Sequence, residues 1–525
     1  MTQNLLPFLA ERPVLYAERL SNFYSSTVKQ GHKKDYGQFF TPVEVAQFMA
    51  SLVFDNRNSI SVLDPGCGVG ILACALIESL VDDNSGIKKI NLVVYEIDEH
   101  VLIYTKKCLE YLQVWLKNCN IVLKYKIYKK DFILENSQVI ENSHSLFCEV
   151  SKFDFIICNP PYFKLPKDDL RVKAVPSIVK GQTNIYVIFM ALASRLLKPD
   201  GEMIFITPRS FASGNNFKLF RKFFIASVKL KRVHLFESRK QLFSKDYISQ
   251  ENIILHTKNE TGDSFDYRFF ISSSKHIKNI DGTSAELIKM SEVIDIQSEE
   301  SILNFPSNAA EYKVISIFRK WKDRLIDYGI KVSTGPVVFF RAGDSLSDEF
   351  KRNISAPMIW PHNVAKMRVV WPDVRIGRSK YIDFTPVSKS ILIQNKNYVL
   401  VRRFSSKDEQ NRLIAAPQIA DKNAGDFIGI ENRLNYIYKS QGELDLYETM
   451  GLAALLNSKI FNDYLRISNG SVNISATELR ELPMPPLSMI AEIGKSIHLV
   501  MNQEAYDANE IVQKVLNVES EYIRN

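Results

Sequence analysis

Short apolar runs alternate with helical periods between about residue 44 and about residue 256. The runs are continuous and rich in β-branched residues, which is typical of strands buried on both faces of a sheet. They predict strands at Ile60–Leu63, Ile90–Tyr95, Tyr125–Lys129, Phe153–Cys158 and Glu202–Thr207. The periodic segments between them predict helices at Val43–Phe54, Ile71–Leu80, His100–Leu116 and Ile185–Leu197. Buried strands separated by helices of this length indicate an α/β domain with a parallel sheet covered on both faces.

The pattern changes between about residues 257 and 305, where Asn, Asp, Gly, Ser and Lys dominate and Tyr267–Ile271 is the one strand-like piece. Such a composition favours loops, so we place a domain boundary between residues 285 and 300. The predicted domains are residues 1–285 and residues 300–525. The second is less regular, with dispersed aromatics, prolines and arginines, and it ends with an amphipathic helix after Pro486.

Composition narrows the class of protein only slightly. With 525 residues, of which 46% are hydrophobic and 24% charged, the chain is a globular protein of several domains rather than a disordered or fibrous one. Its net charge of +8 suits a polyanionic partner, although many enzymes carry as much. The first residues do not have the pattern of a signal peptide, and no apolar run approaches the roughly 18 residues of a membrane span. We therefore expect a soluble, cytoplasmic protein that contacts no membrane.

The cysteines all lie in the first third of the chain. They are Cys67, Cys74, Cys108, Cys119, Cys148 and Cys158. They form no CxxC pair, and no histidine cluster has the spacing of a zinc site. We expect these thiols to be reduced and buried, and we expect no metal.

A glycine-rich loop follows the first predicted strand. Residues 64–70, DPGCGVG, lead from that strand into a helix. Glycines let the backbone turn sharply and approach a ligand, and the helix N-terminus offers free N–H groups. The acid Asp64 is poorly suited to a pyrophosphate but suits a ligand with an ammonium group, such as the methionine end of S-adenosylmethionine. A purely structural turn has the same sequence, so the loop alone leaves both interpretations open.

Acidic residues also follow the next two predicted strands. Glu96 and Ile97 come after the second, where a carboxylate can accept hydrogen bonds from both hydroxyls of a ribose. Enzymes that bind NAD use the same device, so Glu96 indicates an adenosine and not yet a methyl donor. Asp131 and Phe132 follow the third strand, where the carboxylate can accept from an adenine amine and the ring can pack on the base. Asp131 alone could equally cap a helix, and its position after Asp64 and Glu96 favours the ligand role.

The most informative stretch is NPPY, residues 159–162, directly after a buried strand. Open α/β sheets bind substrates outside the carboxyl ends of their strands, where this tetrapeptide lies. An adenine amine is a weak nucleophile because its lone pair is delocalised into the ring. The Asn159 side-chain oxygen and the Pro160 carbonyl can accept its two hydrogens and direct the lone pair towards a methyl donor, while Tyr162 can stack on the base. Asn-Pro is also a common turn, and the acids and glycines before it are what favour the catalytic interpretation.

In this order, the motifs resemble the class of DNA adenine-N6 methyltransferases typified by the TaqI enzyme, and the methylase part of Eco57I-type restriction–modification proteins. The resemblance covers roughly residues 31 to 256. Residues 36–42, YGQFFTP, are similar to the motif that covers the methionine end of the cofactor, and residues 183–189 to the motif whose aromatic packs beside the cofactor adenine. Residues 242–243 resemble the motif whose Phe holds a flipped base against Tyr162, although Phe243 could equally be a core residue.

The resemblance implies a Rossmann-like methyltransferase domain that binds S-adenosylmethionine, followed by a C-terminal α+β target-recognition domain that binds double-stranded DNA. The implied catalytic residues are Asn159, Pro160, Tyr162 and Phe243. The implied cofactor-binding residues are Thr41, Asp64, Gly66, Cys67, Gly68, Glu96, Ile97, Asp131, Phe132, Pro161 and Phe189. It also implies a functional partner, a cognate restriction endonuclease that is encoded separately.

In the second predicted domain, basic and aromatic residues are interleaved at residues 375–380 and 395–404. Such mixtures suit contacts with phosphates and base edges, since arginine can bind guanine through two hydrogen bonds. A solvated strand face has the same composition, so no base is assigned to any of these residues. Nearer the end of the chain, Leu452, Leu455 and Leu456 have the spacing of a helix core.

The leading hypothesis is a DNA adenine-N6 methyltransferase that flips its target base out of the duplex and forms the modification half of a restriction–modification pair. The alternative is an NPPY-type methyltransferase that acts on RNA adenine or on a protein glutamine amide, because both present a planar amino group. The large second domain favours DNA, since the alternative enzymes typically lack a recognition domain of this size. A non-enzymatic scaffold is disfavoured because every matched catalytic position is intact.

Overall fold

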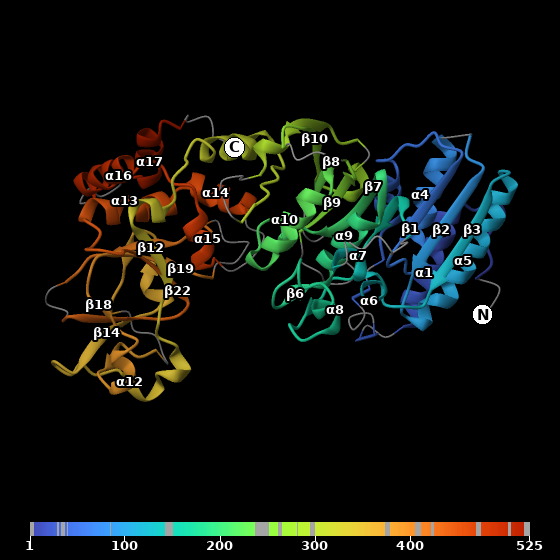
Figure 1. Cartoon of the computed structure of the whole chain (residues 1–525). Coiled ribbons are helices and arrows are strands. Elements are labelled where there is room, and N and C mark those ends of the chain that lie inside the picture. The colour runs from blue at the N-terminus through green and yellow to red at the C-terminus, as the bar shows by residue number, and fades with distance from the viewer. Residues whose placement is uncertain are drawn as a thin grey trace. The chain divides into compact units, whose positions relative to one another are not determined.

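The computed structural model divides into two compact units, Met1–Ser307 and Asn308–Asn525 (Figure 1). It describes residues 5–28, 31–32, 37–38, 40–83, 86–141, 151–236, 251–260, 265–280, 282–294, 300–372, 378–404, 411–421, 425–468, 474–501 and 506–518. Within these ranges, no helix is long and apolar enough to cross a membrane.

The first unit is built on a nine-stranded sheet in the order β11-β10-β8-β9-β7-β4-β1-β2-β3. Its strands are β1 (Ser59–Asp64), β2 (Lys89–Tyr95), β3 (Val122–Tyr128), β4 (Phe153–Cys158), β7 (Leu197–Pro208), β8 (Lys229–Phe236), β9 (Asn252–Lys258), β10 (Arg268–Ser274) and β11 (Ala285–Lys289), with a separate two-stranded pair β5 (Lys164–Leu165) and β6 (Thr183–Asn184). The strands β7, β4, β1, β2 and β3 run parallel, whereas β9 lies antiparallel between β7 and β8. The predicted parallel sheet is confirmed in its central strands. Beyond β7, the last strand predicted for that sheet, β9 follows β8 in the chain and pairs directly with it in the antiparallel sense, so the sheet is mixed there.

Helices cover both faces of this sheet. They are α1 (Pro13–Thr27), α3 (Val43–Ala50), α4 (Ile71–Asp83), α5 (Glu99–Asn118), α6 (Phe132–Asn136), α7 (Gln138–Glu141), α8 (Leu170–Lys173), α9 (Ile185–Leu196) and α10 (Lys218–Ser227). The helices α1, α3, α4 and α5 share one hydrophobic core with alternate residues of the central strands, among them Val62, Phe155 and Ile157. The helix α9 packs with α6, α7 and α10 in the other layer. The predicted α/β class is therefore confirmed.

All the helices and strands predicted in this unit are present, with some shifted ends. The strand β3 begins at Val122, before the predicted Tyr125, and its burial alternates because it lies at the sheet edge and carries exposed lysines. The helix α3 ends at Ala50, before the predicted Phe54. The sequence pattern did not predict α1, whose residues Val14, Ala17 and others pack against the sheet-side helices.

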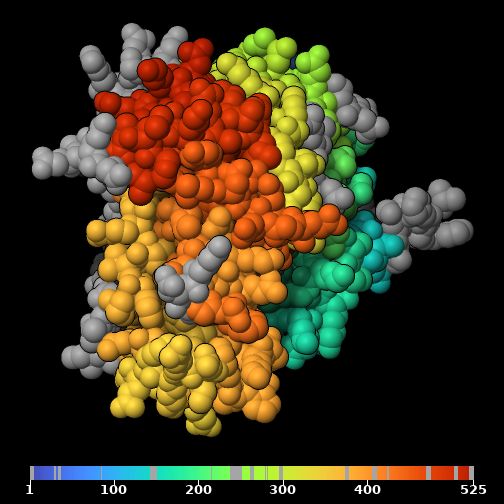
Figure 2. All heavy atoms as spheres, turned by 90° about the vertical axis from the view of Figure 1, so that its left-hand side faces the viewer, coloured from blue at the N-terminus to red at the C-terminus, as the bar shows by residue number. Residues whose placement is uncertain are grey.

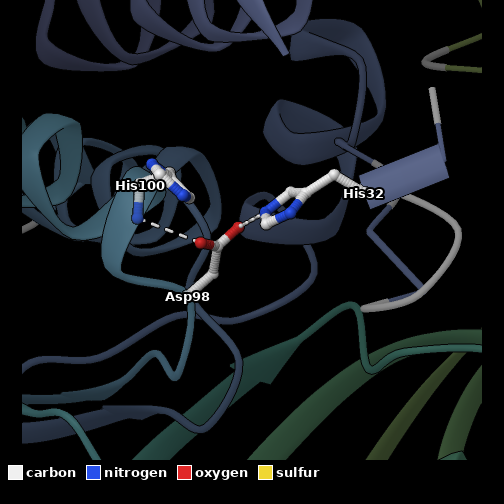
Figure 3. Close-up of side chains that lie close together, drawn as sticks. All are labelled: His32, Asp98 and His100. Atoms are coloured by element: carbon white, nitrogen blue, oxygen red, sulfur yellow. Dashed lines mark hydrogen bonds and ion pairs between the residues drawn. The ribbon is translucent and has the colours of Figure 1, made fainter. Parts of the chain in front are cut away.

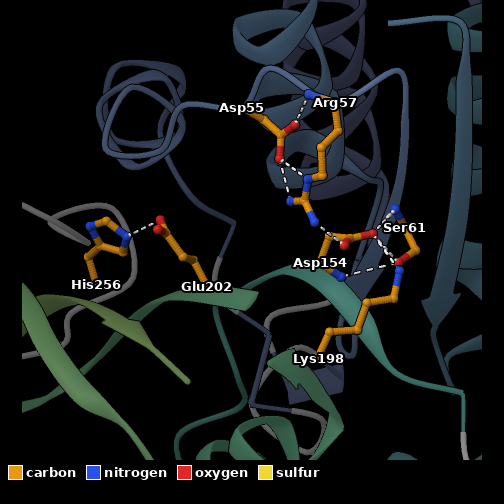
Figure 4. A network of polar contacts seen from close by, with 7 residues as sticks. All are labelled: Asp55, Arg57, Ser61, Asp154, Lys198, Glu202 and His256. Carbon is orange, nitrogen blue, oxygen red and sulfur yellow. Dashed lines mark hydrogen bonds and ion pairs between the residues drawn. The ribbon is translucent and has the colours of Figure 1, made fainter. Parts of the chain in front are cut away.

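A polar network ties together the amino-terminal parts of the central strands (Figure 4). The buried Asp154 of β4 accepts hydrogen bonds from the Ser61 N–H and hydroxyl, at 2.7 and 2.6 Å, and from Lys198 Nζ at 2.8 Å, and it pairs with Arg57. Arg57 also pairs with Asp55, so this connection between α3 and β1 is fixed and α3 does not continue into it. Burial acts to raise the pKa of Asp154, but Lys198 and Ser61 together hold it below its ordinary value. On a neighbouring strand, Glu202 binds His256 at 2.7 Å.

The cysteines that the structure describes are free thiols. Cys67, Cys74, Cys108 and Cys158 are buried, as predicted, but Cys119 is exposed. The prediction is wrong for Cys119 because this residue caps the carboxyl end of α5 at the surface. Cys148 lies outside the described residues.

The first unit extends past residue 285, where the sequence pattern placed its end. The strand β11 pairs antiparallel with β10 and completes the edge of the large sheet. The Ser273 hydroxyl donates to the Ser307 carbonyl at 2.9 Å. The polar composition of this stretch thus reflects edge strands and their connections, and the two compact units divide at Ser307.

The second unit contains a four-stranded sheet, β12-β22-β19-β20, and a five-stranded sheet, β13-β17-β14-β21-β18. The strands of these sheets are β12 (Ile330–Thr334), β13 (Leu346–Ser347), β14 (Ser355–Ile359), β17 (Tyr381–Asp383), β18 (Ile393–Gln394), β19 (Tyr398–Arg402), β20 (Ala415–Gln418), β21 (Phe427–Ile430) and β22 (Leu434–Lys439); β15 (Val364–Ala365) and β16 (Arg368–Val369) form a further pair. The helices are α11 (Ala309–Phe318), α12 (Pro386–Lys389), α13 (Leu446–Asn457), α14 (Lys459–Ser468), α15 (Ala476–Glu481), α16 (Leu487–Val500) and α17 (Ala508–Leu516). Figure 2 shows the C-terminal helices, in red, gathered at one end of this unit and the strand-rich segments, in yellow and orange, at the other. The unit is α+β, and α16 is the amphipathic helix predicted after Pro486.

The helices α13 and α16 cross with their backbones in contact. A Cβ atom at Gly451 would lie 1.9 Å from the Ile490 carbonyl oxygen, and one at Gly494 would lie 1.9 Å from the Tyr447 carbonyl oxygen. The helix α13 also packs on β19 and β20. Its leucines at 452, 455 and 456 are fully buried, which confirms the prediction of a helix core.

Candidate active site

A cavity of about 310 Å³ lies where β1, β2, β3 and β4 end, which is a volume suited to a small ligand. Of the predicted cofactor residues, those that line it are Thr41, Gly66, Cys67, Gly68, Glu96, Ile97, Asp131, Phe132, Pro161 and Phe189. Asn159 lines it as well, whereas Asp64, Pro160 and Tyr162 are not among the lining residues. Phe243 lies outside the described residues, so its predicted role stays a prediction.

The glycine loop forms one wall of the cavity. Gly68 has a φ of +54°, and a Cβ atom there would lie 3.1 Å from the Phe40 ring. A Cβ atom at Gly66 would lie 3.6 Å from the Phe189 ring. Glycine is therefore required at position 68 for backbone conformation, and the two aromatic rings come close to the loop from neighbouring segments.

Asp64 ends β1 directly behind this loop and is fully buried. Its Oδ1 accepts a long hydrogen bond of 3.4 Å from the Gly66 N–H, while its Oδ2 has no hydrogen-bond partner among the described residues. Burial raises the pKa of Asp64 to about 8. A buried carboxyl oxygen without a partner is costly, so this position is suited to a donor or a positive charge brought by a ligand.

Glu96 connects the second strand to the glycine loop. Its Oε2 accepts from the Gly68 N–H at 3.0 Å, and its Oε1 accepts from the Asp98 N–H at 2.9 Å. Burial raises the pKa of Glu96 to about 7. Each oxygen retains a further lone pair, and the side chain lines the cavity, so it can accept hydrogen bonds from a ligand.

Asp131 caps a helix and also lines the cavity, so its predicted ligand role stays a prediction. Its Oδ1 caps α6 by accepting from the N–H groups of Ile133 and Leu134 at 2.9 and 3.1 Å. The same residue lines the cavity, with its Oδ2 3.9 Å from the Arg171 guanidinium. Next to it, the rings of Phe132 and Phe189 lie 5.1 Å apart and form an apolar wall suited to a flat ring.

Asn159 is held from two sides. Its Nδ2 donates to the Thr41 hydroxyl at 3.0 Å, and its Oδ1 accepts from the Tyr162 hydroxyl at 2.6 Å. That hydroxyl is also 2.9 Å from the Ile206 carbonyl oxygen, and its single proton can serve one acceptor at a time. Burial raises the pKa of Tyr162 well above its ordinary value, so it remains a donor. The structure thus brings Thr41, Asn159 and Tyr162 together, with the Tyr162 hydroxyl on the oxygen that the sequence assigned to the target amine.

A buried carboxylate orders the N-terminal segment beside the cavity. Asp98 accepts from the Tyr24 hydroxyl at 2.9 Å, Gln38 Nε2 at 2.7 Å and the His100 N–H at 3.0 Å, and it binds His32 Nε2 at 2.8 Å (Figure 3). The side chains of His32, Asp98 and His100 place possible metal ligands within 4.8 Å of one another. Both Asp98 oxygens already accept hydrogen bonds, so we assign this cluster to holding the segment that carries Gln38 and Thr41.

Sequence reasoning missed several residues that line the cavity: Gly37, Gln38, Phe40, Pro65, Ile71, Leu72, Tyr95, Lys130, Phe163, Arg171 and Ile185. Most of them are direct neighbours of predicted motif residues, so the motifs could have indicated them. Arg171 had no such signal, because it reaches the cavity only through the fold after β4, where its guanidinium lies 5.6 Å from the Phe163 ring centre.

The chain is similar to known restriction–modification proteins. The model of the Eco57I restriction-modification methylase family matches residues 84–243. The type II methyltransferase M.PstI of Providencia stuartii is 30% identical over 475 residues, which cover 90% of this chain and 91% of that protein. M.BsuBI of Bacillus subtilis is 31% identical over 466 residues, which cover 88% of this chain and 90% of that protein. Among solved structures, a DrdV–DNA complex matches 92% of this chain and 59% of that chain at 13% identity, with a TM-score of 0.46. On the strength of the two sequence matches, which extend through both units, the chain belongs to the type II methyltransferases of restriction–modification systems.

Proposed function

We propose that this protein transfers a methyl group from S-adenosylmethionine to N6 of an adenine in double-stranded DNA. The observation that carries the proposal is the position of Asn159, whose amide lines the same cavity as Glu96 and the glycine loop. The acceptor for a target amine therefore faces the place where a methyl donor would bind. Membership of a restriction–modification family supports DNA as the substrate.

The cavity residues fit S-adenosylmethionine. Glu96 supplies negative charge at the cavity wall, and the unpartnered Asp64 Oδ2 lies behind the glycine loop, where the positive charge of a bound ligand would favour the ionised form of this carboxyl. Glu96 would accept from the ribose hydroxyls, and the wall of Phe132 and Phe189 would hold the adenine ring, with Asp131 at its edge. When bound, S-adenosylmethionine supplies an electrophilic methyl group on its sulfonium.

In this mechanism the chain orients the target amine. The Asn159 side-chain oxygen and the Pro160 carbonyl accept the two hydrogens of N6, so the lone pair of the nitrogen is directed towards the methyl group. Asn159 Oδ1 has a second lone pair, so it can accept from N6 while the Tyr162 hydroxyl is in place, and the Ile206 carbonyl at 2.9 Å is a second acceptor for that hydroxyl. Asparagine does not act as a base near neutral pH, so the extra proton on the methylated amine passes to water.

A base inside a duplex cannot reach Asn159, so the enzyme rotates its target adenine out of the stack. The ring of Tyr162 would stack on that base, and Phe243 would close the other side. We assign the second unit, Asn308–Asn525, which falls within the predicted residues 300–525, to target recognition, and the first unit to cofactor binding and chemistry. In the cell, methylation would protect the site from a restriction endonuclease encoded separately.

The proposal is tested by offering the purified protein labelled S-adenosylmethionine together with unmethylated duplex DNA, with RNA or with protein. Digestion of the product and mass spectrometry then identify the methylated base. We expect N6-methyladenine in DNA and no transfer to RNA or protein. Transfer to cytosine, to RNA adenine or to a protein glutamine would replace the proposed substrate by the one observed.

Asn159→Ala tests the role of the asparagine directly. It removes one preorganised acceptor while keeping the glycine loop, Glu96 and the aromatic wall, so turnover should fall by about 10²- to 10³-fold. Binding of S-adenosylmethionine, measured by calorimetry, should change far less. Near-normal turnover in this variant would exclude the role proposed for Asn159.

A further inference from the structure

In the second unit, Arg378 packs against a pair of aromatic rings, Phe339 and Trp360, whose centres lie 5.8 Å apart in an edge-to-face contact. The guanidinium carbon of Arg378 lies 5.0 Å from the centre of the Phe339 ring and 5.0 Å from the centre of the Trp360 ring. The Trp360 indole N–H donates to the carbonyl of Ser379 at 2.8 Å, which fixes the backbone next to Arg378. Trp360 is buried, whereas Phe339 is 42% exposed, so this aromatic pair reaches from the core to the surface.

The guanidinium of Arg378 makes no hydrogen bond or ion pair with any residue in the described ranges. An arginine has five N–H donors in a plane, and stacking on a ring leaves those donors free at the edge of that plane. The side chain therefore packs against two adjoining rings, while its N–H donors have no hydrogen-bond partner among the described residues.

Two further arginines, Arg403 and Arg433, lie near Glu431 together with Arg378. The buried Glu431 carboxylate is influenced by the charges of Arg433, Arg378 and Arg403. Arg403 donates to the Asn432 carbonyl at 2.6 Å, and the side chain of Arg433 is 62% exposed. Three arginines facing one buried carboxylate leave an excess of positive charge, which suits a polyanion.

The backbone holds these segments together. The N–H of Val337 donates to the Ile430 carbonyl at 3.0 Å, and the N–H of Asn432 donates to the Val337 carbonyl at 2.9 Å. The N–H of Glu431 donates to the Ile359 carbonyl at 3.1 Å. The loop that carries Phe339, the strand end that carries Trp360 and the turn that carries Arg433 therefore form one rigid surface.

Resting on the function proposed above, we propose that Arg378 recognises a guanine within the DNA site, with Phe339 and Trp360 as its positioning residues. A planar donor edge matches the O6 and N7 acceptors that guanine presents in the major groove, and this pair specifies the base. A phosphate accepts hydrogen bonds from flexible side chains, so an arginine that binds one does not need aromatic rings to fix its position. Arg433 is exposed and packs on no aromatic ring in the described ranges. It is the phosphate contact at the same surface.

The test compares the wild type with Arg378→Lys, Arg378→Ala and Arg433→Ala in cells free of other adenine methylation. Sequencing of methylated adenines gives the motif of each variant. The wild type should methylate one motif that contains a guanine. In both Arg378 variants the preference for guanine at one position should fall by at least about tenfold, while the other positions keep theirs. Arg433→Ala should lower methylation at all sites evenly and leave the motif unchanged.

Arg319→Ala is the control, because Arg319 is an exposed arginine at the end of α11 and its removal changes the charge equally. It should leave motif and extent unchanged. If a variant methylates too little DNA, its binding to duplexes with single base-pair changes, in competition with the original duplex, gives the same preference. An unchanged motif in the Arg378 variants, or a relaxed position that is not a guanine, overturns the proposal. A wild type that methylates no DNA refutes the proposed function instead, which the variants cannot do.

Discussion

The buried Glu96 makes cofactor binding sensitive to pH in a way that can be calculated. Its pKa of about 7 means that about 90% of it is ionised at pH 8 and about 10% at pH 6. The ionised carboxylate is the better acceptor for ribose hydroxyls. If only this form binds S-adenosylmethionine well, the dissociation constant rises by about tenfold between pH 8 and pH 6, or about 1.4 kcal/mol.

Glu96→Gln removes this titration and keeps the size of the side chain. The amide can accept from only one of the two N–H groups, of Gly68 and Asp98, that Glu96 accepts from now. We expect S-adenosylmethionine binding at pH 8 to weaken by about 1–3 kcal/mol. The pH dependence that remains in the variant belongs to other groups, of which Asp64, with its pKa raised to about 8, is the first candidate.

Isothermal titration calorimetry at pH 6, 7 and 8 on the wild type and the variant measures both effects. The control is Glu99→Gln, because the Glu99 side chain is 69% exposed and pairs with Lys129 away from the cavity lining. Its affinity and pH profile should match those of the wild type. If Glu96→Gln binds as tightly as the wild type and keeps the same slope with pH, Glu96 has no part in holding the cofactor.

Three further predictions concern other parts of the molecule. Tyr162→Phe should keep steady-state turnover within about threefold, since Thr41 still holds the Asn159 amide and the stacking ring remains, whereas Tyr162→Ala should lose the stacking worth about 1–3 kcal/mol. Asp154→Asn should lower the free energy of unfolding, measured with denaturant at pH 7, by about 1–3 kcal/mol. Because the pKa of Asp154 is lowered in the folded state, this difference should be fully present above the unfolded value of about 3.9 and should shrink as the pH falls below it. A chain that ends after Ser307, where the first compact unit ends, should bind S-adenosylmethionine but methylate DNA without site preference; retained preference would contradict the division of roles.

The sequence predicted the centre of the first unit well because its strands are buried on both faces. In β4 every residue from Phe153 to Cys158 is buried, so the apolar run and the strand coincide. The residues that follow such strands reach one edge of a parallel sheet, which is why Glu96, Asp131 and Asn159 could be expected together.

Other features depend on contacts that no local pattern contains. The hydroxyl of Tyr162 on Asn159 follows from how the tetrapeptide folds against β7, whose Ile206 carbonyl is the second acceptor. The sequence indicates a basic and aromatic segment around Arg378, but the rings that Arg378 packs against, Phe339 and Trp360, are distant from it in sequence. Composition could suggest a surface of this kind and could not choose the arginine.

The crossing of α13 and α16 has a mechanical consequence. Where Gly451 and Gly494 meet, each helix has room only for a hydrogen atom on the other, so sliding by one residue in either direction would drive a side chain into a carbonyl. The two helices are thus fixed in register and should move as one rigid pair. The helix α13 packs on β19, and Arg403 follows the last residue of that strand. The rigid helix pair therefore limits how far this arginine can shift when a polyanion is bound.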